Sequence, residues 1–283
     1  MSAAAMRMNC TPPGISQHMS GLEKRLGVEL LTRSSRGVMP TPVGKKFYDK
    51  CLHILRTVSD AEHEIETLRD GVAGSVSVGI IPALSKAILP ASLRRYTADY
   101  PAVDVYISES YAGTLTQSLL SGELDFAVVP TPANTAGLHV EKFSEQPNGL
   151  ISNKMFGLEH MKPVRMDGIP NLKLIMPSYQ HPIRSVIESA IQIGDIKVQK
   201  QLSIDGLIGT LEFVAQSDWS AIVPAALCHN LKTDTRFVIN PIEHPDLRFG
   251  LALLQLERQT LSHPARLLVD IFRQEFDNVD QGW

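Results

Sequence analysis

Apolar residues near the start of the chain recur at the spacing of one helix face, namely Ile15, Met19, Leu22 and Leu26. Thr11 and Pro12 are typical of the first positions of such a helix, and Gly27 is typical of its end. The polar residues between the apolar positions then face outward, with side chains of the types that contact phosphates and base edges. A solvated helix face explains the same pattern.

A longer helix is predicted to begin at Thr41 and Pro42, after a basic turn over residues 32–38. Its apolar positions alternate four and three apart: Phe47, Cys51, Ile54, Val58, Ala61, Ile65 and Leu68. This unbroken seam is typical of a coiled coil and predicts a dimerisation helix that packs against a partner. A long helix docked on its own domain is the alternative.

The pattern of apolar and polar residues changes after the glycine-containing stretch 70–74. Strands and helices then alternate, with strands expected at 76–80, 103–107 and 124–129 and helices at 84–100 and up to residue 120. The pattern resumes with strands at 172–176, 220–223 and 249–254 and helices at 182–193, 208–216 and 264–276. Such alternation predicts an α/β fold with parallel strands in two lobes and a ligand cleft between them.

Charge also divides the chain, with a basic segment over residues 1–50. Residues 1–50 hold eight basic and three acidic residues, a net charge of +5, and this leaves −8 on the remainder. A basic head on an acidic body is expected of a nucleic-acid-binding segment fused to another domain, although chance clustering of surface charge gives the same numbers.

The sequence lacks the motifs that are typical of membrane, secreted, enzymatic and metal-binding proteins. The sequence has no run of eighteen apolar residues and no secretory leader pattern, and its three cysteines are far apart, which together predict a cytoplasmic protein without a membrane span. Nucleophile-elbow, zinc-protease and dinucleotide motifs are missing, and the histidines lack metal-ligand spacing. We therefore expect neither an enzyme nor a bound metal or cofactor.

The motifs taken together resemble the LysR-type transcriptional regulators. Residues 11–38 are similar to the recognition helix and wing of that family, and residues 41–44 to the start of its linker helix. Residues 74–80, 122–129 and 214–224 look like its effector domain. The resemblance implies a winged helix-turn-helix over 1–40, a linker helix over 41–71 and, over 72–283, a two-lobed effector domain like type 2 periplasmic binding proteins. Lobe I would span about 75–148 and 249–283, and lobe II about 150–248. A solute-binding protein is the rival interpretation, against which the basic head argues.

The resemblance also implies site residues. Bases of double-stranded DNA would be approached by Pro13, Ser16, Gln17 and Ser20, and phosphates by Lys24, Arg33, Arg36 and Thr41. A small-molecule effector would meet Ala83, Ser85, Thr114, Ser178, Gln180, His181, Ser203 and Asp205. Hydroxyls and helix N-terminal amides there would suit an organic anion, although helix capping explains the same residues. The linker seam would form a homodimer, with two dimers in a homotetramer as the alternative.

Two departures from the family pattern stand out, and the cysteine content excludes one mode of sensing. Residues 4–8 look like the second helix of the DNA-binding domain, and the helix expected before it has no counterpart in the sequence. Either the sequence is a truncated version or independent DNA binding is lost. Residues 217–219 replace a glycine-rich turn, and Cys228 is the only cysteine of the effector domain, which excludes sensing through a disulfide inside that domain.

Overall fold

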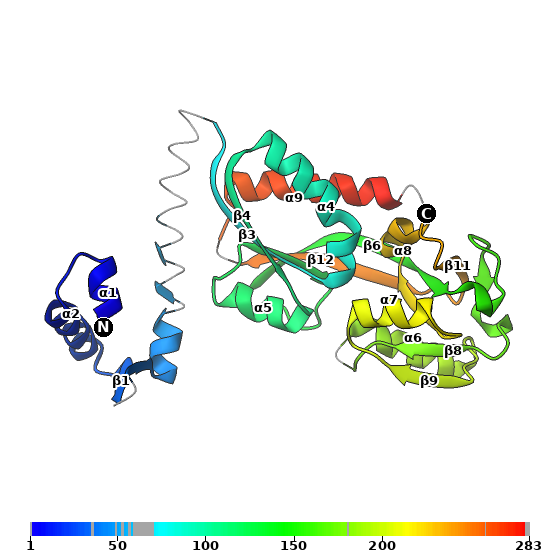
Figure 1. Cartoon of the computed structure of the whole chain (residues 1–283), viewed down its shortest axis with the longest axis horizontal. Coiled ribbons are helices and arrows are strands. Elements are labelled where there is room, and N and C mark those ends of the chain that lie inside the picture. Colours follow the sequence, from blue (N-terminus) through cyan, green and yellow to red (C-terminus); the bar gives the residue numbers. More distant parts are fainter. Residues whose placement is uncertain are drawn as a thin grey trace. The chain divides into compact units, whose positions relative to one another are not determined.

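The computed structural model describes residues 2–34, 37–48, 50–51, 54–55, 58, 71–179, 181–257 and 259–280. The chain forms two compact units, one built mainly from residues 1–59 and a larger one built from most of the residues after them (Figure 1). In the described part, no helix is long and apolar enough to cross a membrane.

The smaller unit contains α1 (Ser2–Arg7), α2 (Pro12–Leu26) and an antiparallel hairpin of β1 (Leu31–Ser34) and β2 (Gly37–Pro40). The hairpin lies where the sequence predicted a basic turn. The predicted limits of α2 are confirmed, because the hydroxyl of Thr11 accepts a hydrogen bond from Gly14 N at 3.2 Å and Gly27 ends the helix with a φ of 70°. Residues 42–48 begin the next helix, as expected.

Side chains and backbone fasten α2, the hairpin and the following helix together. A carboxylate oxygen of Glu23 accepts hydrogen bonds from Leu30 N at 2.8 Å and Leu31 N at 3.0 Å. The hydroxyl of Thr41 accepts from Gly44 N at 2.9 Å, and Thr41 N donates to Leu30 O at 2.9 Å. Gly44 packs so closely that a Cβ there would overlap the carbonyl oxygen of Leu30. These contacts join the three elements into one unit, called the head below.

The first lobe of the larger unit is the predicted parallel α/β arrangement. Its elements in chain order are β3 (Ala73–Ile80), α4 (Pro82–Asp99), β4 (Ala102–Glu109), α5 (Ala112–Leu120) and β5 (Phe126–Pro130). Strand β3 pairs in parallel with both β4 and β5. Helices α4 and α9 (His263–Asp280) lie side by side on one face and α5 covers the other (Figure 1). The fully buried Tyr96 joins the first two through a 2.9 Å hydrogen bond from its hydroxyl to Pro264 O.

The second lobe repeats the arrangement with other strands. Its main elements are β8 (Lys173–Met176), α6 (Pro182–Ile193), β9 (Lys200–Ser203), α7 (Leu207–Ala215), β10 (Ser220–Pro224) and α8 (Ala225–Leu231). Strand β8 pairs in parallel with β9 and β10. Short elements complete this lobe: η1 (Lys154–Phe156), β7 (Val164–Arg165) and η2 (Met166–Gly168).

A long strand that the sequence pattern missed, β6 (Leu138–Ser152), connects the lobes, whereas β12 (Arg248–Leu256) is the strand predicted at 249–254. Strand β6 pairs with β12 along its first part and with β10 and β11 (Val238–His244) along its last part. Pro147 and Gly149 suggest a loop, yet both lie inside the strand. The buried Asn148 fastens the crossing by donating from Nδ2 to Leu247 O at 2.8 Å. The exact residue limits of the lobes stay predictions, because β6 belongs to both.

Candidate ligand pocket and nucleic-acid interface

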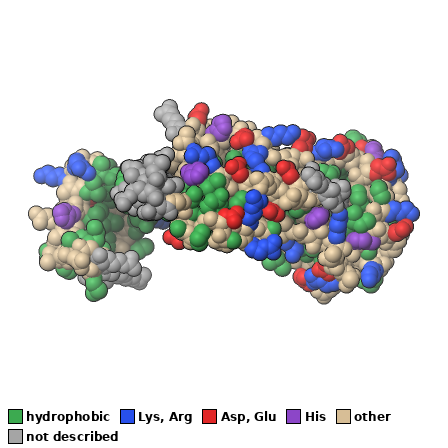
Figure 2. Space-filling model, turned by 90° about the horizontal axis from the view of Figure 1, so that it is seen from above, with side chains coloured by type: hydrophobic (Ala, Val, Ile, Leu, Met, Phe, Trp, Pro, Cys, Tyr) green, Lys and Arg blue, Asp and Glu red, His purple; other side chains and the backbone are tan. Residues whose placement is uncertain are grey.

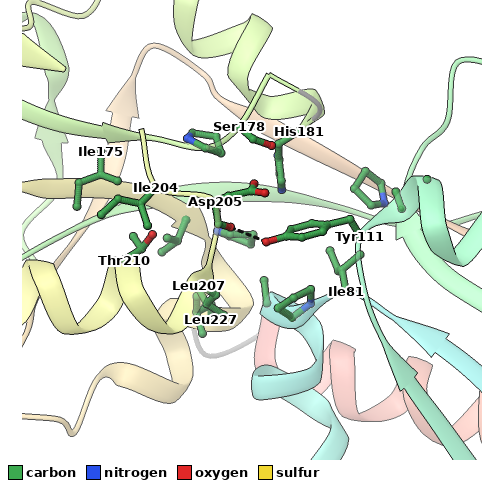
Figure 3. Close-up of a pocket in the computed structure, with 18 residues that line it drawn as sticks. Ile81, Tyr111, Ile175, Ser178, His181, Ile204, Asp205, Leu207, Thr210 and Leu227 are labelled. Carbon is green, nitrogen blue, oxygen red and sulfur yellow. Dashed lines mark hydrogen bonds between the residues drawn. The ribbon is translucent and has the colours of Figure 1, made fainter. Parts of the chain in front are cut away.

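A pocket of about 210 Å³ lies between the two lobes, where strands end and helices begin (Figure 3). Its walls are largely apolar, with the branched side chains Ile81, Ile175, Ile204, Leu207, Val223 and Leu227 and the prolines Pro82, Pro130, Pro177 and Pro224. A ligand that fits this lining has an apolar body.

The N-terminal ends of helices from both lobes meet at this pocket. Helix α6 is capped by Nδ1 of His181, which accepts from Ile183 N at 3.4 Å, and α8 by the buried Gln146, whose Oε1 accepts from Ala226 N at 3.2 Å. Helices α4 and α7 instead follow Ile81 and Gly206, which offer no side-chain oxygen. Their first-turn N–H groups and partial positive charge therefore suit a negatively charged group of a ligand.

Five polar side chains interrupt the apolar lining: Tyr111, Ser178, His181, Asp205 and Thr210. The hydroxyl of Tyr111, from the first lobe, donates to the backbone carbonyl oxygen of Asp205, in the second lobe, at 2.8 Å (Figure 3). Burial lowers the pKa of His181 below its usual value, against the opposing effect of the Asp205 carboxylate. The pKa of Tyr111 is raised, mainly by burial and to a smaller extent by the negative charge of Asp205. At neutral pH the imidazole and the phenol are therefore both uncharged.

The structure brings half of the expected effector residues together in this lining, namely Ala83, Ser178, His181 and Asp205. Ser85 lines a neighbouring groove, and Thr114 is an exposed residue of α5 outside the pocket lining. The hydroxyl of Ser203 lies 3.1 Å from Nη1 of Arg184 and accepts its hydrogen bond. Gln180 lies outside the described residues.

Sequence reasoning missed Tyr111, Thr210 and the apolar wall. Tyr111 lies directly before α5 and after the end of β4, so its position at a strand-to-helix junction was the available signal. Thr210 lies inside α7 and has no such position, and its hydroxyl donates to Gly206 O, at the N-cap of that helix, at 3.1 Å.

Arg184 is a basic residue beside this pocket, and Nε and Nη1 of its guanidinium already have hydrogen-bond partners in the protein. It is 5% exposed and donates to Pro177 O at 2.7 Å, to Ser203 and to Glu188 Oε1 at 2.7 Å. Its guanidinium also stacks 3.7 Å from the ring centre of Tyr179. Arg184 therefore holds the loop after β8 in place.

Helix α2 presents the side chains expected to meet DNA. Pro13, Gln17, Ser20 and Lys24 are exposed and Ser16 is half-buried. The half-buried Thr41 uses its hydroxyl at the start of the next helix, as described above. The side chain of Arg33 and all of Arg36 lie outside the described part.

The described part of the linker seam is apolar and largely uncovered. Ile54 is 60% exposed and Val58 52% exposed, whereas Phe47 and Cys51 are half-buried. Figure 2 shows green apolar side chains spread over the visible face of the smaller unit. Ala61, Ile65 and Leu68 lie outside the described residues.

Both units match models of known protein families. The family model for the LysR substrate binding domain matches residues 69–277, and the model for bacterial regulatory helix-turn-helix proteins of the lysR family matches residues 1–45. The nitrogen assimilation regulatory protein Nac of Escherichia coli is 24% identical over 273 residues, which cover 96% of this chain and 88% of Nac.

Solved structures show the same fold over nearly the whole chain. A variant of full-length OxyR from Pseudomonas aeruginosa has a TM-score of 0.72 at 17% identity and covers 99% of this chain and 91% of its own. Full-length CbnR complexed with its target DNA has a TM-score of 0.60 at 21% identity, over 97% and 93% of the two chains. These relatives are regulators rather than solute-binding proteins, which removes the rival interpretation. The chain therefore belongs to the LysR family of transcriptional regulators, with a DNA-binding helix-turn-helix domain and an effector-binding domain.

Proposed function

We propose that this regulator reads an operator with α2 and changes its DNA binding when a small molecule occupies the pocket between the lobes. The observation that carries the proposal is the pocket itself, an apolar cavity at which uncapped helix N-termini from opposite lobes meet. A ligand that contacts both lobes has a different affinity for their open and closed arrangements, and this difference can shift the equilibrium between them.

For DNA binding, the exposed side chains of α2 fall into those suited to contact base edges and those suited to contact phosphates. Pro13, Ser16, Gln17 and Ser20 lie within the first nine residues of the helix, and the N-terminal residues of a recognition helix approach base edges in helix-turn-helix proteins. Lys24 lies in its last turn, where a flexible cation suits a phosphate. Arg33 and Arg36 of the wing would add phosphate contacts, whereas Thr41 would act mainly as a structural cap.

For the effector, we propose a small organic molecule with an anionic carboxylate. Its negative charge would face the first turns of α4 and α7, and its apolar part would lie among Ile81, Ile175 and Leu227. Ser178 and His181 add polar groups to the lining from the second lobe.

We further propose a homodimer held by the linker helices, with a tetramer of two dimers as the larger assembly. The exposed Ile54, Leu55 and Val58 support this, because three large apolar side chains on one short helical stretch are unfavourable in water. A regulator that acts on chromosomal DNA works in the cytoplasm, in keeping with the free cysteines of this chain.

Binding of the full chain to duplexes selected from a random pool tests the function. We expect affinity that falls steeply with salt, and an affinity for the selected operator that changes when a stabilising carboxylate is added. Candidate carboxylates come from thermal-unfolding screens, in which a ligand at 100 times its Kd adds about 2.7 kcal/mol of stability. The proposal fails if the chain retains no duplex at low salt, or if ligands that stabilise it leave DNA binding unchanged.

A further inference from the structure

A carboxylate of the protein lies inside the proposed effector pocket. Asp205 lies in the short turn between β9 and α7, one residue before Gly206, and its side chain lies among Ser178, His181 and Tyr111 (Figure 3). Asp205 is an exposed residue, so its carboxylate is accessible to a ligand. Its charge acts on both neighbouring titratable groups, His181 and Tyr111.

No lysine or arginine is found among the pocket-lining residues that the structure describes. The nearby Arg184 is engaged by Pro177, Ser203 and Glu188. His181 does not replace a basic residue, because its burial favours the neutral imidazole.

Basic side chains occur instead in the adjoining groove, beyond Tyr111. That groove is lined by Lys86 and Arg236, and Arg236 is already paired with Asp234 at 2.8 Å and Glu212 at 2.9 Å. The pocket therefore combines two kinds of electrostatic site: the positive ends of α4 and α7 and one negative side chain.

These two sites make opposite demands on a ligand. A simple carboxylic acid would place its negative charge against the helix ends while Asp205 repels it. A ligand that also carries an ammonium group would satisfy both, because the ammonium donates charge-assisted hydrogen bonds to Asp205 and the carboxylate accepts from the helix N–H groups. Apolar walls then surround the rest of the molecule.

We infer that the effector is a zwitterion of the amino-acid type, with its amino group on Asp205, its carboxylate at the first turns of α4 and α7, and an apolar side chain among the isoleucines and leucines. This inference rests on the proposed effector pocket and narrows its ligand class.

Matched pairs of probes test the amino group directly. Neutral amino acids with side chains from alanine to phenylalanine are each compared with the acid that lacks the amino group, for example leucine with isocaproate, and with the amine that lacks the carboxylate, isoamylamine. Binding to the full chain is measured by calorimetry and thermal unfolding. We expect the best amino acid to bind at least about tenfold more tightly than its acid, as one charge-assisted hydrogen bond allows.

Variants assign that preference to one side chain. Asp205→Asn should bring the amino acid and its acid to nearly equal affinity, and Asp205→Glu should restore part of the preference. Asp246→Asn is the control, since Asp246 is an exposed carboxylate paired with Arg248 and lies outside the pocket lining. Unfolding of each unliganded variant shows that it is folded.

The inference is overturned if the acids bind as tightly as the amino acids, if Asp205→Asn keeps the preference, or if no amino acid binds. The proposed function is judged separately by DNA binding. A simple acid that binds the pocket and changes operator affinity would leave the function standing and remove only the zwitterion.

Discussion

Truncation of two exposed side chains of α2 should impair DNA binding in two different ways. Gln17 and Lys24 are both exposed on this helix, seven residues apart, so neither change removes packing. We expect Gln17→Ala to weaken recognition of the selected operator specifically, because an amide reads base edges. Lys24→Ala should weaken binding to every duplex, because an ammonium neutralises phosphates without reading sequence.

The sizes of the two effects follow from the kind of contact. One phosphate contact contributes about 0.9 to the slope of log K against log salt, so two copies of Lys24 in a dimer contribute about 1.8. When the salt concentration rises fourfold, the DNA affinity of the parent therefore falls by a factor about twelve times larger than the affinity of the Lys24→Ala protein does. A bidentate amide contact is instead worth about 1–3 kcal/mol per base, with no change in slope.

Fluorescence anisotropy over a series of salt concentrations measures both quantities with the selected operator and a scrambled duplex. Lys154→Ala is the matched control, because Lys154 is an exposed lysine of the larger unit, on η1 and outside the pocket lining. The assignment of α2 as the reading helix is refuted if Lys24→Ala keeps the parent slope and Gln17→Ala keeps the parent ratio of operator to scrambled affinity.

Three other predictions concern the linker, the head and the cysteines. Val58→Glu should convert the dimer to monomer in sedimentation equilibrium, because each buried seam valine contributes roughly 1.5–3 kcal/mol; an unchanged mass would show that the seam is not intermolecular. Gly44→Ala should lower the free energy of unfolding of the head by about 1–3 kcal/mol in urea titrations, since its Cβ would overlap Leu30 O, and equal stability would contradict this contact. Burial raises the pKa of the Cys228 thiol far above its usual value, so little thiolate forms at mildly alkaline pH. Iodoacetamide should therefore label the exposed Cys10 well before Cys228 in native protein, and equal rates by mass spectrometry would contradict the buried thiol.

Elements with strong local signals were predictable from sequence. Helix α6 spans the predicted residues 182–193 because Pro182 fits its first turn and Gly194, at a φ of 88°, ends it. Helix α2 has the same kind of boundaries. Strand β6 was not predictable, because Pro147 and Gly149 are typical of loops and only its pairing with β10, β11 and β12 makes it a strand.

The pocket was predictable only in part. Ser178, His181 and Asp205 follow from the resemblance, but their neighbours Ile81 and Leu227 are 146 positions apart in sequence and read as ordinary core residues. Tertiary packing alone decides that these apolar side chains line a cavity. Ser203 and Thr114 show the opposite case, since hydroxyl residues at plausible positions lie outside the lining.

The tight contact between Gly44 and Leu30 has a mechanical consequence. Because backbone meets backbone there, a rotation of the start of the linker helix would displace the hairpin, and the hydrogen bonds to Glu23 would couple that displacement to α2. We therefore expect the head to move as one unit. In the proposed dimer, we expect an effector to alter the separation and relative angle of two such units, so that operators would differ in their response through the phasing of their half-sites along the double helix.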